Sequence, residues 1–203
     1  EAEALDGVKH LIARRGGIGA LRAEGAKRAA DQRGQGAEEF AMHVKGLEFG
    51  MHDPRLKWGM GIIYSVEAAG ADHHAGFHDT LFTQESPLLE RLRGMGATRP
   101  LPANDLSADK VANAKAMHMW AMVKDSMVSC SFVPWGIDQH VEIISAATGW
   151  TYSAHEAQRL AERIATLGRI FNLREGITSA QDQMPKRMFE GTPTGALQSG
   201  GVD

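Results

Sequence analysis

The sequence predicts an all-α, multihelical fold. Apolar residues recur three and four positions apart in several segments, and many of these segments are bounded by capping residues or by glycine. Convincing alternation of apolar and polar residues is missing, as are a β–α–β rhythm and an internal repeat. With 203 residues, the chain has ample material for a hydrophobic core, in one large domain or two small ones.

Four helices are predicted in the first third of the sequence. Residues 14–17 carry basic side chains followed by glycine, which should end the first helix. Gly25 interrupts the second, which indicates close packing or a break. Residues 45–57 should be irregular, because Asp53 precedes a proline and is pushed away from the helical region. The predicted helices cover residues 2–14, 18–32, 36–43 and 59–69.

The later helices are separated by clear breaks. Residues 94–104 are rich in glycine and proline, which predicts a loop. Asp105 or Ser107 should then cap a helix that reaches about residue 128. Its methionines at positions 117, 119 and 122 are interpreted as core residues. A shorter helix is predicted at residues 137–148, ending at a glycine.

The last helix has a well-defined start in the sequence. Ser153 and Glu156 have the spacing of a capping box, and apolar residues then follow one stripe. Gly168 should end this helix. From Gly191 onward the sequence is rich in Gly, Ser and Thr, and we expect it to lie on the surface or to be disordered.

Composition argues against several classes of partner. The net charge is −3 and both signs are interspersed, which is not the pattern of a nucleic-acid-binding face. The longest strongly apolar run, residues 60–66, is far too short to span a bilayer, and no secretory leader is visible. A single cysteine argues against a disulfide framework and favours a reducing compartment, so we expect a cytoplasmic protein.

The beginning of the chain looks internal to a longer polypeptide. The sequence opens at Glu1 without methionine, and Leu5, Val8 and Leu11 already follow helical spacing. We therefore expect this chain to be a piece of a longer protein.

Cys130 and a histidine-rich turn are the two candidate sites that the residues themselves suggest. A lone thiol forms neither an internal disulfide nor, unaided, a structural zinc site, so a buried core cysteine is the simplest interpretation. His74 and His78 are four residues apart, which suits one helix face and allows a zinc site. A solvated, glycine-broken turn with incidental histidines is the favoured interpretation, since the spacing matches no established zinc motif.

The order of several short motifs resembles a known family. In chain order, the similarity involves residues 21–30, 36–48, 53–55, 70–73, 149–150, 162–164, 171–176 and 182–187. Together they resemble the C-terminal half of the tungsten-containing aldehyde ferredoxin oxidoreductases. The resemblance implies two mainly helical domains. We therefore expect residues 1–104 to be the C-terminal part of the middle domain, and residues 105–203 to be the C-terminal domain.

The resemblance gives the segment around Cys130 a role. It implies that Cys130 is the fourth ligand of a 4Fe–4S cluster, whose other three cysteines lie in sequence that this chain lacks. A thiolate suits iron as a soft ligand. It also implies that Asp125 and Ser129 bind one of two pterins that chelate tungsten or molybdenum. Val128 stands where the family usually has glycine, and valine is a poor substitute if the backbone there needs a positive φ.

The resemblance also assigns the Gly-Ala-Asp-His segment. It implies that His73 faces the tungsten and the substrate, where an imidazole suits proton transfer during aldehyde oxidation. Asp72 and Arg55 would contact the cofactor, and Glu48 would act beside it as a second catalytic group. His74 has no counterpart in the family, and as the adjacent residue we expect its side chain to point elsewhere.

The resemblance implies a tungstopterin and iron–sulfur oxidoreductase that converts small aldehydes to carboxylic acids, with ferredoxin as electron acceptor. One cysteine does not complete a four-iron cluster, so both cofactors would require the missing N-terminal half or a complementary chain. A homo-oligomer is compatible with the sequence. The alternative is a non-catalytic helical module that lacks cofactor and acts by docking to a partner.

Overall fold

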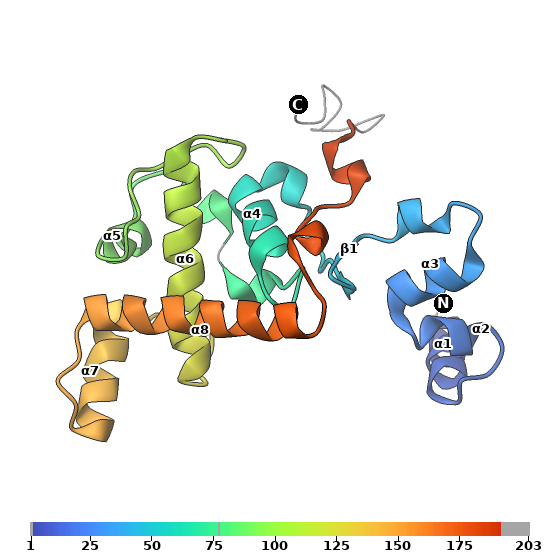
Figure 1. Ribbon diagram of the computed structural model, residues 1–203, viewed down its shortest axis with the longest axis horizontal. Helices are drawn as coiled ribbons and strands as arrows, with labels where there is room; N and C mark the ends of the chain where they lie inside the picture. Colours follow the sequence, from blue (N-terminus) through green and yellow to red (C-terminus); the bar gives the residue numbers. More distant parts are fainter. Residues whose placement is uncertain (1, 77, 192–203) are drawn as a thin grey trace.

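The protein is helical, and its predicted all-α, multihelical class is confirmed (Figure 1). A computed structural model describes residues 2–76 and 78–191. The α-helices are α1 (Ala2–Ala13), α2 (Ile18–Arg22), α3 (Gly25–Arg33), α4 (Trp58–Val66), α5 (Pro87–Arg93), α6 (Ala108–Ser126), α7 (Ile137–Thr148) and α8 (Ala154–Arg174). Shorter 3₁₀ helices are η1 (Ala37–Phe40), η2 (Pro54–Leu56), η3 (His73–Ala75), η4 (Asp79–Phe82), η5 (Ser179–Gln181) and η6 (Lys186–Phe189). In the described part of the chain, no helix is both long and apolar enough to cross a membrane.

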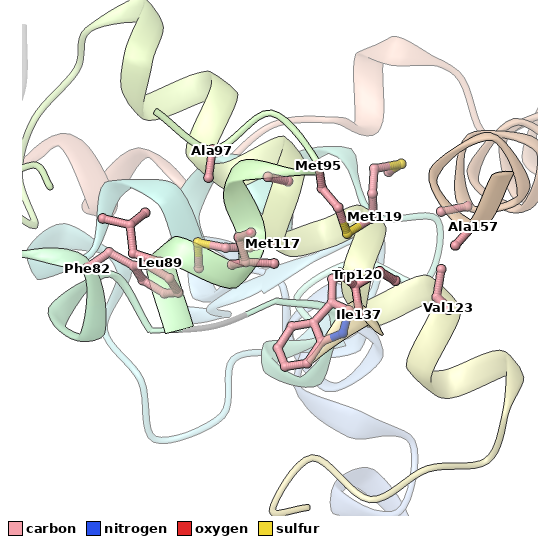
Figure 2. Close-up of a cluster of buried hydrophobic side chains, with 13 residues drawn as sticks. Phe82, Leu89, Met95, Ala97, Met117, Met119, Trp120, Val123, Ile137 and Ala157 are labelled. Carbon is pink, nitrogen blue, oxygen red and sulfur yellow. The ribbon is translucent and has the colours of Figure 1, made fainter. Parts of the chain in front are cut away.

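Helix α6 is the central element of the larger part of the molecule. It packs against α4, α5 and α8, while α1–α3 form a separate group at one end (Figure 1). Met117, Trp120 and Val123 of α6 are buried in one apolar cluster with Leu89 of α5 and Ala157 of α8 (Figure 2). The prediction that the α6 methionines serve the core is therefore confirmed. The division of the chain at residue 104 stays a prediction.

A buried ion pair fixes the starts of α4 and α6. The Asp79 carboxylate accepts hydrogen bonds from the backbone N–H groups of Gly59 and Met60, in the first turn of α4. Lys110, near the start of α6, places its Nζ 2.7 Å from Asp79 Oδ1, and both side chains are almost fully buried. A Cβ on Gly59 would lie 2.6 Å from this carboxylate, so glycine is required at this position.

A small hairpin replaces part of the segment that was predicted to be irregular. Strands β1 (His43–Val44) and β2 (Leu47–Glu48) pair antiparallel around a two-residue turn. The turn residues Lys45 and Gly46 have φ of 54° and 89°, as a type I′ hairpin requires. Two-residue strands are too short to show alternation in the sequence, which explains why they were not predicted.

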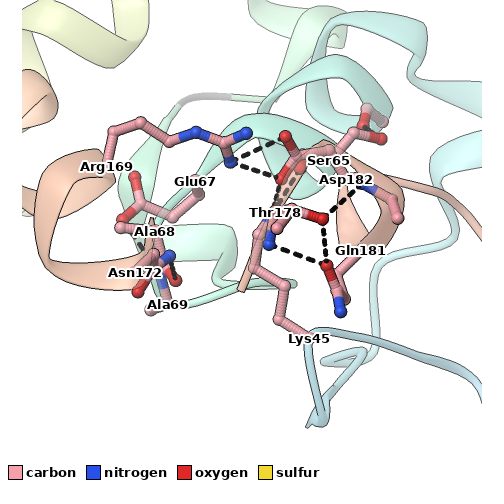
Figure 3. Close-up of polar contacts among 12 residues, drawn as sticks. Lys45, Ser65, Glu67, Ala68, Ala69, Arg169, Asn172, Thr178, Gln181 and Asp182 are labelled. Atoms are coloured by element: carbon pink, nitrogen blue, oxygen red, sulfur yellow. Dashed lines mark hydrogen bonds and ion pairs between the residues drawn. The ribbon is translucent and has the colours of Figure 1, made fainter. Parts of the chain in front are cut away.

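Polar contacts hold this hairpin against the segment that follows α8 (Figure 3). The buried Lys45 Nζ lies 2.8 Å from Asp182 Oδ1 and donates to the backbone carbonyl of Ser65 at 2.6 Å. Arg169 of α8 contacts the other oxygen of the same carboxylate at 2.8 Å. Asp182 thus neutralises two cations from segments far apart in the sequence.

Two predicted helix boundaries were wrong because glycine plays a different role at each. The predicted helix 18–32 is two helices, since Gly25 has a φ of +83° and separates α2 from α3. The last helix does not end at Gly168 but continues to Arg174. A Cβ on Gly168 would lie only 3.0 Å from Ala68 Cβ, so this glycine lets α8 pack closely against the segment that follows α4.

Other predicted elements are confirmed more closely. Ser107 caps α6, and Ser153 accepts a hydrogen bond from the Glu156 N–H at the start of α8. The predicted helix at residues 36–43 is only the 3₁₀ turn η1, and α5 was not predicted. The predicted surface tail lies outside the described residues from position 192 onward.

Candidate functional site

The Gly-Ala-Asp-His segment forms a tight turn after α4. Gly70 has a φ of +106°, and the Asp72 carboxylate accepts a hydrogen bond from the His74 N–H at 2.8 Å. This bond caps η3, which carries His73. The contact that the Asp72 carboxylate makes here is with the backbone of the turn, and its predicted role in cofactor binding stays a prediction.

The end of the turn is held firmly against the helical core. Ala75 is buried and packs with Ile63 of α4 and Ala114 of α6. A Cβ on Gly76 would lie 2.3 Å from the Ile63 side chain, so the backbone passes very close to α4. The position of His73 is therefore set by two helices rather than by a free loop.

Four histidine rings gather at this turn. The His52 ring lies with its centroid 4.9 Å from that of His73 and 4.3 Å from that of His78. The rings of His73 and His74 are 4.0 Å apart, so the prediction that His74 points elsewhere was wrong. Lys57 Nζ lies 2.7 Å from His78 Nδ1. The loop 45–57 therefore does lie beside the histidine turn.

Burial and mutual repulsion lower the pKa of three of these histidines below 6.5. For His73, burial lowers the pKa most, the charge of His74 lowers it further, and Asp72 opposes both. For His52 and His78 the largest cause is again burial, followed by Lys57. His73 is accordingly a neutral imidazole at neutral pH, able to accept a proton.

This histidine cluster does not have the geometry of a metal site. Within residues 2–76 and 78–191, no three His, Cys, Asp or Glu side chains are arranged to hold a metal ion. The zinc interpretation of His74 and His78 therefore has no geometric support. The His52 and His78 rings meet edge to face, and the His73 and His74 rings are tilted by 40°.

A cleft of about 530 Å³ opens beside the turn. Its walls come from the loop after β2 and from η6, and its lining residues are Met42, Phe49, Gly50, Met51, His52, Asp53, Arg55, Arg187 and Met188. A Cβ on Gly50 would lie 3.0 Å from His73 Nδ1, so the wall of the cleft directly adjoins this imidazole. The mixture of apolar and basic side chains suits a small ligand with a polar group.

Arg55 and Glu48 are engaged in local contacts. Arg55 lies in the cleft wall, where its guanidinium binds both oxygens of Asp53 and lowers the pKa of that carboxyl. The Glu48 carboxylate accepts a hydrogen bond from the Ala26 N–H at the start of α3. Its observed role is thus to join the hairpin to the N-terminal helices.

The second candidate site follows the end of α6. The Val128 N–H donates to the Asp125 carbonyl at 2.9 Å, and the Ser129 N–H donates to the Lys124 carbonyl at 3.0 Å. These two bonds form a Schellman motif, which places a left-handed residue just beyond the helix. Val128 occupies that position with a φ of +55°, where a β-branched side chain is strained.

Cys130 is exposed, so the interpretation as a buried core cysteine was wrong. Its Sγ accepts a hydrogen bond from the Phe132 N–H at 3.5 Å. Asp125 is also exposed, on the last turn of α6, and Ser129 Oγ lies 3.4 Å from His140 Nε2. The Schellman motif thus brings the predicted pterin and cluster residues onto one short surface segment.

The family described as "Aldehyde ferredoxin oxidoreductase, domains 2 & 3" matches residues 1–202. The chain belongs to this family. Similar proteins include the tungsten-containing aldehyde ferredoxin oxidoreductases of Pyrococcus furiosus and Thermococcus kodakarensis, each 31% identical over 182 residues. A third is the aliphatic sulfonate oxidoreductase, WOR-like subunit, of Pyrococcus furiosus, which is 28% identical over 202 residues.

These relatives are much longer than the present chain. The match to the two tungsten-containing enzymes covers 88% of this chain but only 28% of each relative. For the sulfonate oxidoreductase subunit the shares are 93% and 27%. This member of the aldehyde ferredoxin oxidoreductase family therefore spans little more than a quarter of the length of each of these relatives.

Replacing Val128 with glycine should stabilise this member of the family. Glycine adopts the left-handed conformation without the cost of about 1–2 kcal/mol that a side chain incurs. Its greater freedom in the unfolded chain offsets about 0.4–1 kcal/mol. The side chain of Val128 is 93% exposed, so little packing is lost. Urea denaturation should show a net gain of up to about 1.6 kcal/mol.

Val111→Gly is the matched control, because Val111 is an exposed valine inside α6. There the substitution should destabilise the protein, since glycine is unfavourable in a helix interior. A loss of stability at both positions would show that Val128 is not strained.

Proposed function

We propose that this chain is the C-terminal portion of a tungstopterin and iron–sulfur oxidoreductase that oxidises aldehydes to carboxylic acids and passes the electrons to ferredoxin. Family membership and the names of the relatives support the oxidoreductase class. The observation that carries the proposal is the exposure of Cys130, the sole thiol of the chain, on a well-defined turn at the end of α6.

The surroundings of Cys130 fit a cluster ligand. An exposed thiol is accessible to a cluster that a further part of the protein would hold. The N–H of Phe132, which already points at Sγ, would remain as a donor to a cluster thiolate. The three further thiolates of a 4Fe–4S cluster would have to come from other sequence, because this chain holds a single cysteine.

Asp125 and Ser129 would contact a pterin on the same surface segment. An exposed carboxylate is a suitable acceptor for the N–H groups of a pterin ring. Arg55 and Asp72 would contact the cofactor from the side of the cleft, and there the ion pair with Asp53 and the cap of η3 would fix their orientations. When bound, tungsten or molybdenum in a bis-pterin would supply the two-electron redox chemistry that no side chain can perform.

His73 would accept a proton as the substrate is oxidised. Oxidation of an aldehyde with one water yields the carboxylic acid, two protons and two electrons, and ferredoxin would take up the electrons. The imidazole is neutral at neutral pH because burial lowers its pKa, so it is in the basic form that this role needs. Glu48 remains the second candidate catalytic group, although its carboxylate contacts α3 in this structure.

Exposed apolar side chains support the need for a further polypeptide. Phe132 is 95% exposed next to Cys130, and Val128 and Trp135 are exposed on the same segment. Large apolar groups in one place mark an interaction surface. We propose that the remainder of the enzyme, in the same or a complementary chain, covers this segment and completes both cofactor sites.

Metal analysis and visible spectroscopy of the native, full-length protein test the proposed function. We expect tungsten or molybdenum, about four iron atoms per protein, and reduction of ferredoxin that depends on added aldehyde. The 203-residue chain alone should bind neither metal stoichiometrically. A full-length protein without metal would favour the non-catalytic helical module instead.

The activity of the complete enzyme should fall at acidic pH. His73 accepts a proton only when it is neutral, and its pKa lies below 6.5 in the folded protein. Activity should therefore be full above pH 6.5 and decline as the pH falls through the lowered pKa of His73. The pH dependence of kcat/KM measures this decline. A midpoint well above pH 6.5 would contradict the assignment of His73 as the proton acceptor.

A further inference from the structure

A buried Glu–His pair supports the turn that carries His73. Glu67, just after α4, and His118, in the middle of α6, are each less than a tenth exposed. His118 Nδ1 lies 2.9 Å from the backbone carbonyl oxygen of Ala75, and its Nε2 lies 3.3 Å from Glu67 Oε2. The ring therefore spans from the end of α4 to the last residue of η3.

The chemistry of these contacts fixes the direction of one bond. A carbonyl oxygen carries no hydrogen, so Nδ1 must be the protonated nitrogen that donates to Ala75. Nε2 then faces a buried carboxylate oxygen that has no hydrogen bond of its own within the described residues. At 3.3 Å, the Glu67 carboxylate is close enough to orient the imidazole ring of His118.

The bond to the Ala75 carbonyl affects His73 because both residues belong to the same short helix. Ala75 is the last residue of the three-residue helix η3, and His73 is the first. The carbonyl that His118 holds therefore lies two residues from the candidate base. The Asp72 carboxylate caps the start of the same turn, and the His118 ring holds the carbonyl at its end.

We propose that His118, oriented by Glu67, is a positioning residue that holds η3 through the Ala75 carbonyl and thereby fixes the imidazole of His73 at the wall of the cleft. The effect of His118 on turnover rests on the proposed function of His73. The effect of His118 on the position of η3 does not. Neither Glu67 nor His118 touches the cleft, so neither acts on a ligand there directly.

Two substitutions at one position separate the two contacts. Asparagine carries its amide nitrogen near the place of Nδ1, so His118→Asn can still donate to the Ala75 carbonyl. Glutamine carries its amide nitrogen near the place of Nε2, so His118→Gln reaches Glu67 but leaves Ala75 without a donor. Glu67→Gln is the third variant, because its amide can donate to Nε2 of a neutral His118 and preserve the orientation.

The measurement is the NMR titration of His73 in the 203-residue chain, with resonances assigned from His73→Asn. Loosening η3 would expose His73 to water and move it away from His52, His74 and Asp72. Since burial is the main cause that lowers the pKa of His73, His118→Gln should raise its titration midpoint toward 6.5. His118→Asn and Glu67→Gln should leave the midpoint close to that of the parent protein.

Stability and activity complete the test. Thermal denaturation identifies any general destabilisation, which both His118 variants would share. Only His118→Gln should shift the titration midpoint of His73. In the complete enzyme, kcat should fall about tenfold or more for His118→Gln and much less for His118→Asn. A His73 titration that is the same in both variants overturns the inference. If His118→Gln shifts the titration but His73→Asn retains activity, the positioning holds and the proposed function of His73 fails.

Discussion

Turnover of the complete enzyme should fall by about 10²–10⁴-fold when His73 is replaced with asparagine, the usual cost of losing a general acid or base. The neutral imidazole adjoins the cleft at Gly50, and asparagine cannot accept the proton there. Metal and cluster content should stay near that of the parent enzyme, because His73 is not proposed as a ligand. Steady-state kinetics with an aldehyde and metal analysis of the same preparation provide the measurement.

His74→Asn is the matched control. The His74 ring lies against that of His73, but burial lowers the pKa of His73 more than His74 does, so the loss of His74 should have a small effect. It is more exposed than His73, and its own backbone N–H is held by Asp72. Equal losses in the two variants would show that the wrong histidine was chosen. Loss of metal with retained activity per metal would make His73 structural.

Replacing Cys130 with serine should abolish the iron–sulfur signal of the complete enzyme. Serine is a hard and poorly ionised ligand for iron compared with a thiolate. Because Cys130 is exposed, the substitution removes no core packing and should leave helical content unchanged. Loss of the cluster can then be distinguished from loss of the fold. Electron paramagnetic resonance of the reduced enzyme, iron analysis and far-ultraviolet circular dichroism provide the three readouts.

Cys130→Ala controls for any ligation by the serine hydroxyl, and should lose the cluster in the same way. Full iron occupancy in both variants would falsify the ligand role of Cys130. A variant that loses the cluster together with its helical signal would point to a folding defect, and the exposed thiol gives no reason to expect one.

Most of the helical fold could be predicted from local patterns. Ser107 and Ser153 cap their helices as the sequence indicates, because an N-cap bond needs only residues within one turn. Gly25 and Gly168 were harder, since the effect of a glycine depends on what lies opposite it. A left-handed backbone breaks the helix at Gly25, whereas at Gly168 the neighbouring Ala68 takes up the space of the missing side chain.

The candidate site was predictable only in part. His73 could be selected by resemblance, but His52 approaches it from a separate loop, and no sequence pattern brings those two rings together. The pair of Glu67 and His118 joins the end of one helix to the middle of another. Such contacts depend on tertiary packing. The positive φ of Val128, by contrast, follows from its place one residue beyond a helix C-cap.

The carboxylate of Asp182 sets a minimum length for this part of the protein. It neutralises Lys45, whose side chain is only 1% exposed, and it also binds Arg169. A truncation before residue 182 would leave Lys45 as a buried cation without a counter-ion, a defect that typically costs several kcal/mol. Deletion series that trim the C-terminus for expression or crystallisation should therefore retain Asp182.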